Sequence, residues 1–223
     1  MSTATLTTVL FKRGLRNVFI QGVFLLNRNS PRMVGEAFTL RYIPAREDID
    51  QLGAFEGRGH PQREAIEACP PGHVLVMDAR RDASAATGGD ILMTRLMVRG
   101  AAGIVTDGGL RDSPTIEKLD FPVYCGARSA PLNLVRHHAI DMQQPIGCGG
   151  VAVYPGDVLV GDGEGVVVIP AKMADEVAKE AEAQTQFEDW VEARVKEGRS
   201  IFGLYPPSAE TKAEYEAWKA KRK

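Results

Sequence analysis

The chain has 223 residues, a formal net charge of -2, 44% apolar residues and 25% charged residues. This balance is typical of a globular protein and argues against a disordered chain or a coiled coil. It provides no broad basic field for nucleic acid, and no apolar run approaches the ~20 residues that span a bilayer.

The three cysteines, at positions 69, 125 and 148, form no CxxC pair. An odd number without paired spacing predicts free thiols in a reducing compartment rather than a disulfide framework. The first ten residues carry no Lys or Arg and no long apolar stretch, so no signal peptide is expected. We therefore expect a cytoplasmic protein that binds neither membrane nor nucleic acid.

The first half of the chain predicts alternating strands and helices. Residues 18–26 are apolar and ambiguous between helix and strand. The pattern then predicts strands at 34–42, 73–79, 102–107 and 122–125, with helices near 63–69 and 91–100. The order strand, glycine loop, helix, strand, glycine loop, strand over 73–125 favours parallel strands with crossover connections.

From about residue 145 the pattern changes to short strands joined by tight turns, at 151–154, 158–162 and 166–169. Residues 171–196 are rich in Ala, Glu and Lys and predict one long helix. A polar, helical tail follows from Ser200. No internal repeat or linker is visible, so we expect a single α/β domain over 1–199 with a C-terminal helical extension over 200–223.

Two loops carry the candidate site, at 87–92 and 108–112. Loops that follow the carboxyl ends of parallel strands gather in one crevice. The first loop precedes a helix, so its backbone N–H groups favour an anion, and Gly88 and Gly89 allow a ligand to approach the main chain. In the second loop, Arg111 is a planar donor for a carboxylate.

The same loops offer ligands for a hard divalent cation. Asp112 is a candidate metal ligand, and Asp90 is expected to bind the ion directly or through water. Backbone amides, one guanidinium and a carboxylate-held metal together suit a 2-oxo acid, with the metal acting as Lewis acid for an enolate. An ordinary turn before a helix, followed by a surface ion pair, gives the same pattern. Spacing alone therefore leaves two interpretations open, a catalytic site and a structural turn.

The stretches GGDILMTRLMVRGAAGIVTDGGLRD and VYPGDVLVGDGEGVVVIP give this sequence a resemblance to the RraA-like family, over roughly residues 30–190. That family contains class II 4-hydroxy-4-methyl-2-oxoglutarate aldolases and regulators of ribonuclease E. The resemblance implies an α/β/β/α sandwich that assembles into trimers or hexamers. It also implies a magnesium- or manganese-dependent lyase that forms pyruvate from a 4-hydroxy-2-oxo acid and decarboxylates oxaloacetate.

The resemblance also assigns roles to residues of this chain. Arg111 would contact the pyruvyl oxygens, Asp112 would anchor Mg²⁺ or Mn²⁺, and Asp90 would belong to the metal's hydration shell. Glu188 of a neighbouring subunit's C-terminal helix would also approach the metal. The substrate-binding residues implied in the glycine loop are Gly88, Gly89, Asp90, Ile91 and Leu92.

One position departs from the family pattern. Thr115 stands where related aldolases and decarboxylases carry a second carboxylate three residues after the aspartate, and Glu117 follows two residues later. This departure favours the competing interpretation, a non-enzymatic protein that binds and regulates a ribonuclease. The polar segment 43–60 is predicted to determine which group beyond the pyruvyl portion is accepted.

Overall fold

The fold is drawn from a computed structural model that describes residues 1–221. Its helices are α1 (Thr3–Lys12), α2 (Pro61–Ala68), α3 (Asp90–Val98), α4 (Ser113–Ile116), α5 (Ala174–Lys196) and α6 (Ala209–Ala220). Its strands are β1 (Phe24–Leu25), β2 (Met33–Pro44), β3 (His73–Asp78), β4 (Gly103–Leu110), β5 (Val123–Arg128), β6 (His137–Met142), β7 (Val158–Gly161) and β8 (Val166–Ile169). Single 3-10 turns include η1 (Leu52–Phe55) and η2 (Asn133–Val135).

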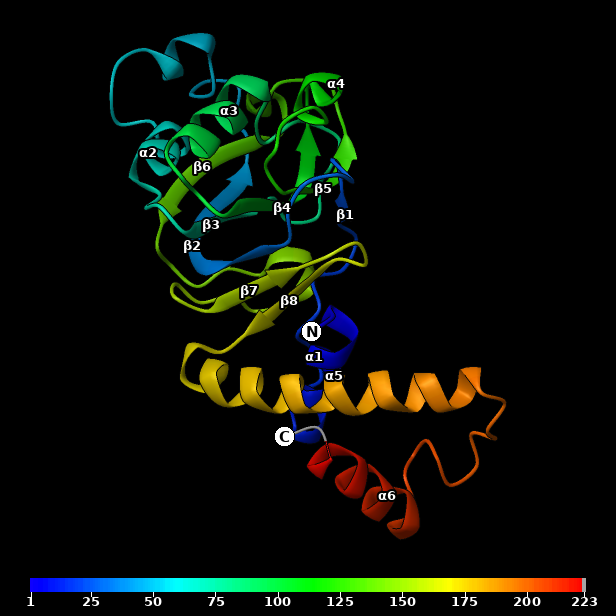
Figure 1. Ribbon diagram of the computed structural model, residues 1–223. Coiled ribbons are helices and arrows are strands. Elements are labelled where there is room, and N and C mark those ends of the chain that lie inside the picture. Colours follow the sequence, from blue (N-terminus) through cyan, green and yellow to red (C-terminus); the bar gives the residue numbers. More distant parts are fainter. Residues whose placement is uncertain (222–223) are drawn as a thin grey trace.

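The strands form one sheet in the order β1-β5-β4-β3-β2-β7-β8, with β6 paired to β2. Strands β2, β3, β4 and β5 run parallel, as the order of elements over 73–125 predicted. Strand β7 pairs antiparallel with β2, and β8 pairs antiparallel with β7. The sheet thus has a parallel part and an antiparallel part, which curls beneath it (Figure 1).

Alternation along β3 shows how the layers are built. Leu75 and Met77 pack with α2 and α3 in one core, whereas Val74 and Val76 point to the opposite face, toward the β7–β8 layer. Successive side chains of a strand point to opposite faces, so a wholly apolar strand must be covered on both sides. Fully burying each such side chain stabilises the fold by about 1.5–3 kcal/mol.

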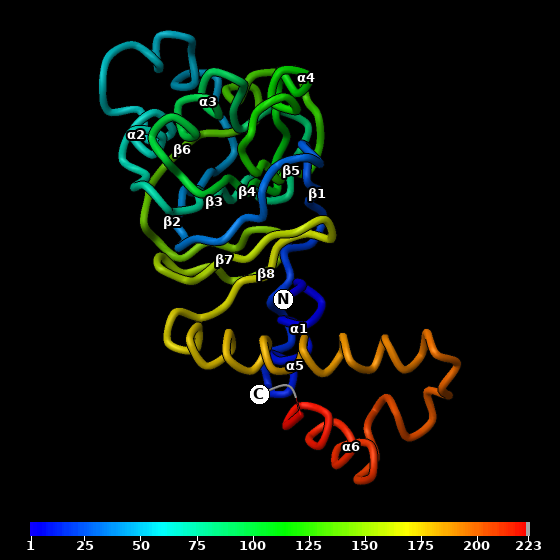
Figure 2. The backbone as a smooth tube through the Cα atoms, in the orientation of Figure 1, coloured from blue at the N-terminus to red at the C-terminus, as the bar shows by residue number. Residues whose placement is uncertain are grey.

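A third core lies below the β7–β8 layer, where α1 and α5 cover strand β8. It contains Leu6, Val9, Leu10, Val18, Val167, Ile169, Val177 and Ala181. Figures 1 and 2 therefore show four layers, with α2, α3 and α4 above the parallel strands and α1 and α5 below the antiparallel ones. The predicted α/β/β/α sandwich is confirmed.

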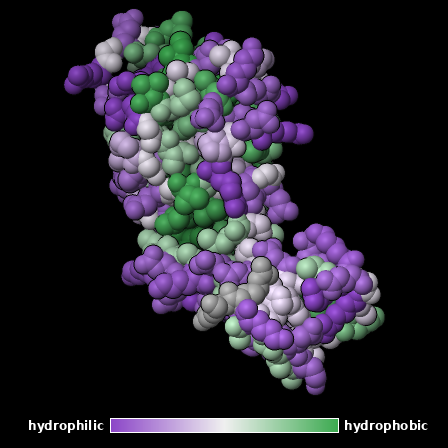
Figure 3. Space-filling model, in the orientation of Figure 1, coloured by the Kyte–Doolittle hydropathy of each residue, from purple (hydrophilic) through white to green (hydrophobic). Residues whose placement is uncertain are grey.

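The C-terminal part extends away from these layers. The second half of α5 projects beyond the sheet, and α6 folds back beneath it (Figure 2). Trp190 of α5 packs with Leu204 and with Tyr215 of α6 in a separate aromatic cluster. On the face shown in Figure 3, the C-terminal helices are largely hydrophilic, whereas hydrophobic surface lies in the middle and at the upper end of the body. No described helix has both the length and the apolar character needed to cross a bilayer.

Several predicted elements need correction. The glycine loop expected at 108–112 is shorter than predicted, because β4 continues through Gly108, Gly109 and Leu110. The segment 151–154 is not a strand, and only Val153 pairs with Ile146 in an isolated bridge. The sequence prediction also missed α1, whose N-terminus is capped when the Ser2 side chain accepts a hydrogen bond from the Thr5 amide.

Candidate functional site

The two candidate turns lie side by side at the carboxyl end of β4. The Arg111 amide donates to the Gly88 carbonyl at 3.1 Å, and the Thr87 amide donates to the Gly109 carbonyl at 2.8 Å. Ala86 and Gly109 form a parallel bridge that extends the sheet into the first turn. The backbone itself therefore fixes Arg111 and Asp112 next to the glycine loop.

Buried side chains hold the first turn from behind. Gln62 of α2 donates to the Thr87 carbonyl at 2.6 Å, and the Tyr42 hydroxyl donates to the same carbonyl at 3.2 Å. The Thr87 hydroxyl is bonded to the Thr106 hydroxyl at 3.0 Å. Burial raises the pKa of Tyr42, so its hydroxyl stays a neutral donor. The glycine loop is thus anchored to β2, α2 and β4.

A cavity of about 230 Å³ opens where the two turns meet. It is lined by Phe55, Gln62, Arg63, Ala86, Gly88, Gly89, Asp90, Ile91, Leu92, Arg111, Asp112, Leu132 and Asn133. Drug-sized ligands occupy pockets of roughly 300–1,000 Å³, so this cavity suits a small metabolite. It collects every residue that the sequence placed in the site, with the exception of Glu188.

Arg111 and Asp112 face this cavity while forming an ion pair with each other. The Arg111 Nε lies 3.2 Å from Asp112 Oδ2, and the two side chains are 46% and 40% exposed. Within residues 1–221, no protein group accepts a hydrogen bond from the terminal nitrogens of Arg111, which remain available to a ligand. Asp112 adopts a left-handed backbone with φ 58°, a conformation that concentrates at functional sites in residues other than glycine.

Gly89 is required by the close approach of these two side chains. A Cβ at this position would lie 2.7 Å from Asp112 Oδ2 and 3.1 Å from Arg111 Cγ. Its φ of -137° and ψ of -176° are ordinary extended backbone, so space rather than conformation selects glycine. The glycine-loop prediction is refined here, because only part of the loop has free amides.

The amides at the start of α3 divide into two groups. The Ile91 amide is bonded to Asp90 Oδ1 at 2.8 Å, and the Leu92 amide donates to the Gly89 carbonyl at 3.1 Å. Among the described residues, the amides of Gly89 and Asp90 have no protein acceptor. These two N–H groups, at the positive end of the helix dipole, are the ones that suit an anion.

Asp90 and Asp112 supply the carboxylate oxygens of the cavity that could bind a cation. The described part of the chain contains no cluster of three or more His, Cys, Asp or Glu side chains able to enclose a metal. Mg²⁺ is usually held by only one or two carboxylates, with waters and substrate oxygens completing its shell. Two aspartates on an open cavity therefore fit Mg²⁺ or Mn²⁺, with room left for a chelating ligand.

Glu188 is not brought to the cavity by its own chain. Its Oε2 accepts a hydrogen bond from the Thr5 hydroxyl at 3.0 Å, and its Oε1 accepts one from the Tyr205 hydroxyl at 3.1 Å. It therefore lies in the α1–α5 layer, on the far side of the sheet from α3. The family resemblance implied that Glu188 belongs to a neighbouring subunit's site, and this stays a prediction.

Glu117 does not supply the carboxylate that is missing at position 115. Thr115 is exposed on α4 and is absent from the cavity lining. Glu117 is paired with the Arg128 guanidinium. The cavity therefore has one carboxylate fewer than the pattern expected from the family resemblance.

Six lining residues were not singled out from the sequence, namely Phe55, Gln62, Arg63, Ala86, Leu132 and Asn133. Only Phe55 belongs to the segment 43–60 that was predicted to determine specificity, and Ala86 directly precedes the first predicted loop. The others come from α2 and from the turn before β6, and no local pattern marks them because their role depends on the tertiary packing of these elements.

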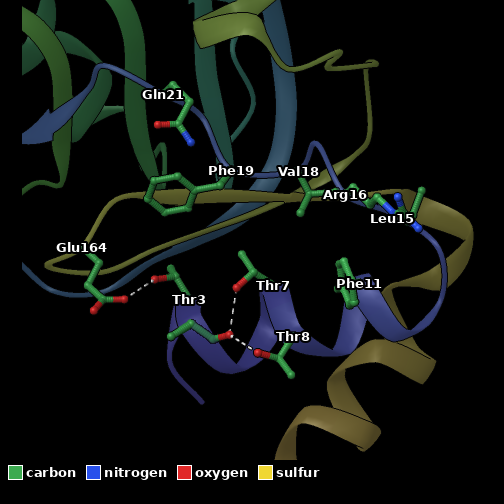
Figure 4. Close-up of a pocket in the computed structure, with 11 residues that line it drawn as sticks. Thr3, Thr7, Thr8, Phe11, Leu15, Arg16, Val18, Phe19, Gln21 and Glu164 are labelled. Carbon is green, nitrogen blue, oxygen red and sulfur yellow. Dashed lines mark hydrogen bonds between the residues drawn. The ribbon is translucent and has the colours of Figure 1, made fainter.

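A second hollow, of about 510 Å³, lies between α1 and the segment 15–21, with Glu164 of the β7–β8 turn at its edge (Figure 4). Its hydroxyl groups are already bonded, since Thr7 and Thr8 both donate to the Ala4 carbonyl. The Arg16 guanidinium lies over the Phe11 ring at 5.6 Å. This hollow is larger than the cavity beside α3 but lacks its combination of paired carboxylates, free amides and guanidinium.

Comparison with known proteins places this geometry in context. The profile of the RraA-like family, described as Aldolase/RraA, matches residues 3–168. A protein of Halalkalibacterium halodurans named "Putative 4-hydroxy-4-methyl-2-oxoglutarate aldolase" is 37% identical over 119 residues, which is 53% of this chain and 56% of that protein. A protein of the same name from Ectopseudomonas mendocina is 32% identical over 112 residues, 50% of this chain and 68% of that protein.

Two solved structures share the fold over most of their length. An uncharacterized protein of Pseudomonas syringae pv. tomato has a TM-score of 0.78 at 26% identity, covering 92% of each chain. Streptomyces coelicolor RraAS2, described as an unusual member of the RNase ES inhibitor RraA protein family, has a TM-score of 0.75 at 30% identity. That match covers 85% of this chain and 90% of RraAS2. By contrast, the sequence match to the Halalkalibacterium halodurans protein spans little more than half of that protein.

Proposed function

The chain belongs to the RraA-like family, and from this premise we propose that it is a divalent-metal-dependent carbon–carbon lyase that forms pyruvate. The observation that carries the proposal is one cavity holding Arg111, Asp112 and the free amides of the glycine loop. The names of the two aldolase relatives point to 4-hydroxy-4-methyl-2-oxoglutarate as substrate. Decarboxylation of oxaloacetate uses the same pyruvyl half and is proposed as a second activity.

The groups of the cavity match the pyruvyl half of such a substrate. The free terminal nitrogens of Arg111 would donate to the pyruvyl oxygens, and the Gly89 and Asp90 amides would donate to the carboxylate. Asp112 and Asp90 would hold the divalent ion. When bound, that ion supplies a Lewis acid for the charge that develops on the 2-oxo group.

The proposed reaction breaks the bond between C3 and C4. The C4 hydroxyl loses a proton and becomes a carbonyl, while the electron pair stays on C3 as the enolate of pyruvate. Arg111 would stabilise the negative oxygen of that enolate, and the bond from its main-chain amide to the Gly88 carbonyl holds its backbone beside the glycine loop. The Asp90 carboxylate would take the hydroxyl proton through water and return it to C3.

Assembly belongs to the same proposal. We propose a homotrimer or homohexamer in which Glu188 of one subunit completes the metal side of a neighbour's cavity, where Thr115 leaves a carboxylate missing. Light scattering of the purified chain tests the assembly. A monomeric chain that retained full metal-dependent activity would contradict it.

The experiment is a pyruvate assay with 4-hydroxy-4-methyl-2-oxoglutarate and with oxaloacetate, in Mg²⁺ or in EDTA. We expect pyruvate to appear in Mg²⁺ only, and the Arg111→Ala variant to release almost none. Equal release by the wild-type chain and this variant, or no release in Mg²⁺ by either, would refute the proposal.

A second candidate function is regulation of a ribonuclease. It is favoured by the similarity to RraAS2 and by Thr115 in place of a carboxylate. Adding the purified chain to an RNase E-type cleavage reaction distinguishes the two. Inhibition of cleavage by a chain that forms no pyruvate would favour the regulator.

A further inference from the structure

The cavity beside α3 has a wall that the pyruvyl half of a substrate does not use. This wall consists of Phe55 from η1, Arg63 from α2, and Leu132 and Asn133 at η2. In Figure 1, α2 and the 45–60 segment lie on one side of α3, and α4, which follows Asp112, lies on the other. A ligand held by Arg111 would therefore extend toward α2.

Arg63 is the cation of this wall. Among the described residues, no carboxylate lies within ion-pair distance of its guanidinium, whereas Arg95 on α3 is paired with Glu67 at 2.8 Å. The Arg63 guanidinium instead lies over the Phe55 ring, 4.7 Å from the ring centroid. Stacking on a ring fixes a guanidinium by its face and leaves the N–H groups at its edge free for an anion.

The neighbours of Arg63 make the wall rigid and rich in donors. Phe55 packs against the His60 ring with centroids 4.8 Å apart, which ties the 45–60 segment to the start of α2. The pKa of His60 is lowered by burial and by Arg63, so this ring adds no competing charge at neutral pH. Asn133 is only 5% exposed, and its side-chain nitrogen has no partner within residues 1–221. An unpaired buried donor is costly unless something accepts its hydrogen bond.

The charges around the cavity agree with this assignment. Arg111 is paired with Asp112, whereas Arg63 has no carboxylate partner among the described residues. A second carboxylate on the ligand gives the Arg63 guanidinium an anion, whereas a ligand with one carboxylate, held by Arg111, leaves Arg63 without one.

We infer that Arg63, supported by Phe55 and Asn133, binds the carboxylate at the far end of the substrate. It thereby selects 2-oxo acids with a second carboxylate over those that end in an alkyl group. The inference rests on the proposed function and adds to it the residue that recognises the distal group. Arg63 takes no part in bond breaking, so its contribution is to substrate binding and specificity.

The test uses two uncleaved ligands of equal length, 2-oxoglutarate and 2-oxopentanoate, which differ only in a terminal carboxylate against a methyl group. Their dissociation constants are measured by calorimetry in Mg²⁺ for the wild-type chain and for Arg63→Gln. We expect the variant to bind 2-oxoglutarate roughly 10- to 100-fold more weakly, the range of one charge-assisted hydrogen-bonded contact, with 2-oxopentanoate unchanged. Arg63→Lys should recover part of the loss.

The matched control is Arg16→Gln, which removes a guanidinium stacked on Phe11 in the hollow beside α1 (Figure 4). This control should bind both ligands as the wild-type chain does. Equal weakening of both ligands in Arg63→Gln, or no preference for 2-oxoglutarate in the wild-type chain, would overturn the inference while leaving the proposed function standing. Failure of the wild-type chain to bind either ligand and to release pyruvate would instead overturn the proposed function.

Discussion

Replacing Gly89 by alanine is a sharp test of the site, because the added methyl group meets only the two side chains assigned to the chemistry. The new Cβ would lie 2.7 Å from Asp112 Oδ2, whereas ordinary contacts begin at 3.4 Å. Asp112 would have to retreat by about 0.7 Å, and Arg111 Cγ, at 3.1 Å, by about 0.3 Å. Both atoms belong to half-exposed, flexible side chains that can move without disturbing the core.

The magnitude follows from that displacement. A misplacement of about 1 Å costs an enzyme roughly 100-fold in rate. We therefore expect Gly89→Ala to lower kcat for pyruvate release by roughly 10- to 100-fold, which is about 1.4–2.7 kcal/mol. The free energy of unfolding should change by no more than ~1 kcal/mol, because the backbone at residue 89 is extended and accepts an alanine.

The assay measures pyruvate release and thermal unfolding of the same preparation. Gly163→Ala is the matched control, since a Cβ at this turn between β7 and β8 meets no atom within 4 Å. Its activity and melting temperature should equal those of the wild-type chain. Full activity in a folded Gly89→Ala variant would refute the assignment of Arg111 and Asp112 to the reacting centre.

Three further predictions concern single side chains. Arg111→Ala should lower kcat/KM for pyruvate release by roughly 100- to 1,000-fold, the cost of losing one preorganised donor, and a smaller than tenfold loss would contradict its role. EDTA should abolish activity, and added Mg²⁺ should restore it. The Asp112→Asn variant should need at least tenfold more Mg²⁺ for its half-maximal rate. An unchanged half-maximal Mg²⁺ concentration would exclude Asp112 as a ligand. Burial is the main cause that lowers the pKa of His137 below its ordinary value of 6.5. The unfolded chain therefore binds a proton more readily than the folded chain. The contribution of His137 to stability is complete above pH 6.5 and is lost as the pH falls below that value. Lowering the pH from neutral to about 5.5 should therefore lower the melting temperature of the wild-type chain more than that of His137→Gln. Equal losses of melting temperature in the two chains would contradict this.

The sequence predicted the parallel half of the fold well, for a physical reason. Strands such as β3 are buried on both faces and read as continuous apolar runs, and glycine loops mark where they end. Helix α1 was missed because its threonines resemble a polar loop. They are tolerated there because Thr3 donates to Asp162 and Thr5 donates to Glu188, contacts that only the folded chain provides.

The site was predictable in part. Arg111 and Asp112 adjoin the glycine loop in the sequence pattern of the family, and the parallel pairing of β3 with β4 brings the two turns together. Arg63 and Asn133 could not be found this way, because an arginine in a helix and an asparagine in a turn are ordinary on their own. Their meaning comes from α2 and η2 packing around the same cavity.

The most direct measurement is a crystal structure of the chain with Mg²⁺ and oxalate, a stable analogue of the pyruvate enolate. We predict oxalate in the cavity beside α3, accepting hydrogen bonds from the Arg111 guanidinium and from the amides of Gly89 and Asp90, with Asp112 bound to the metal. Oxalate and Mg²⁺ bound elsewhere, with Arg111 still paired only to Asp112, would contradict the account.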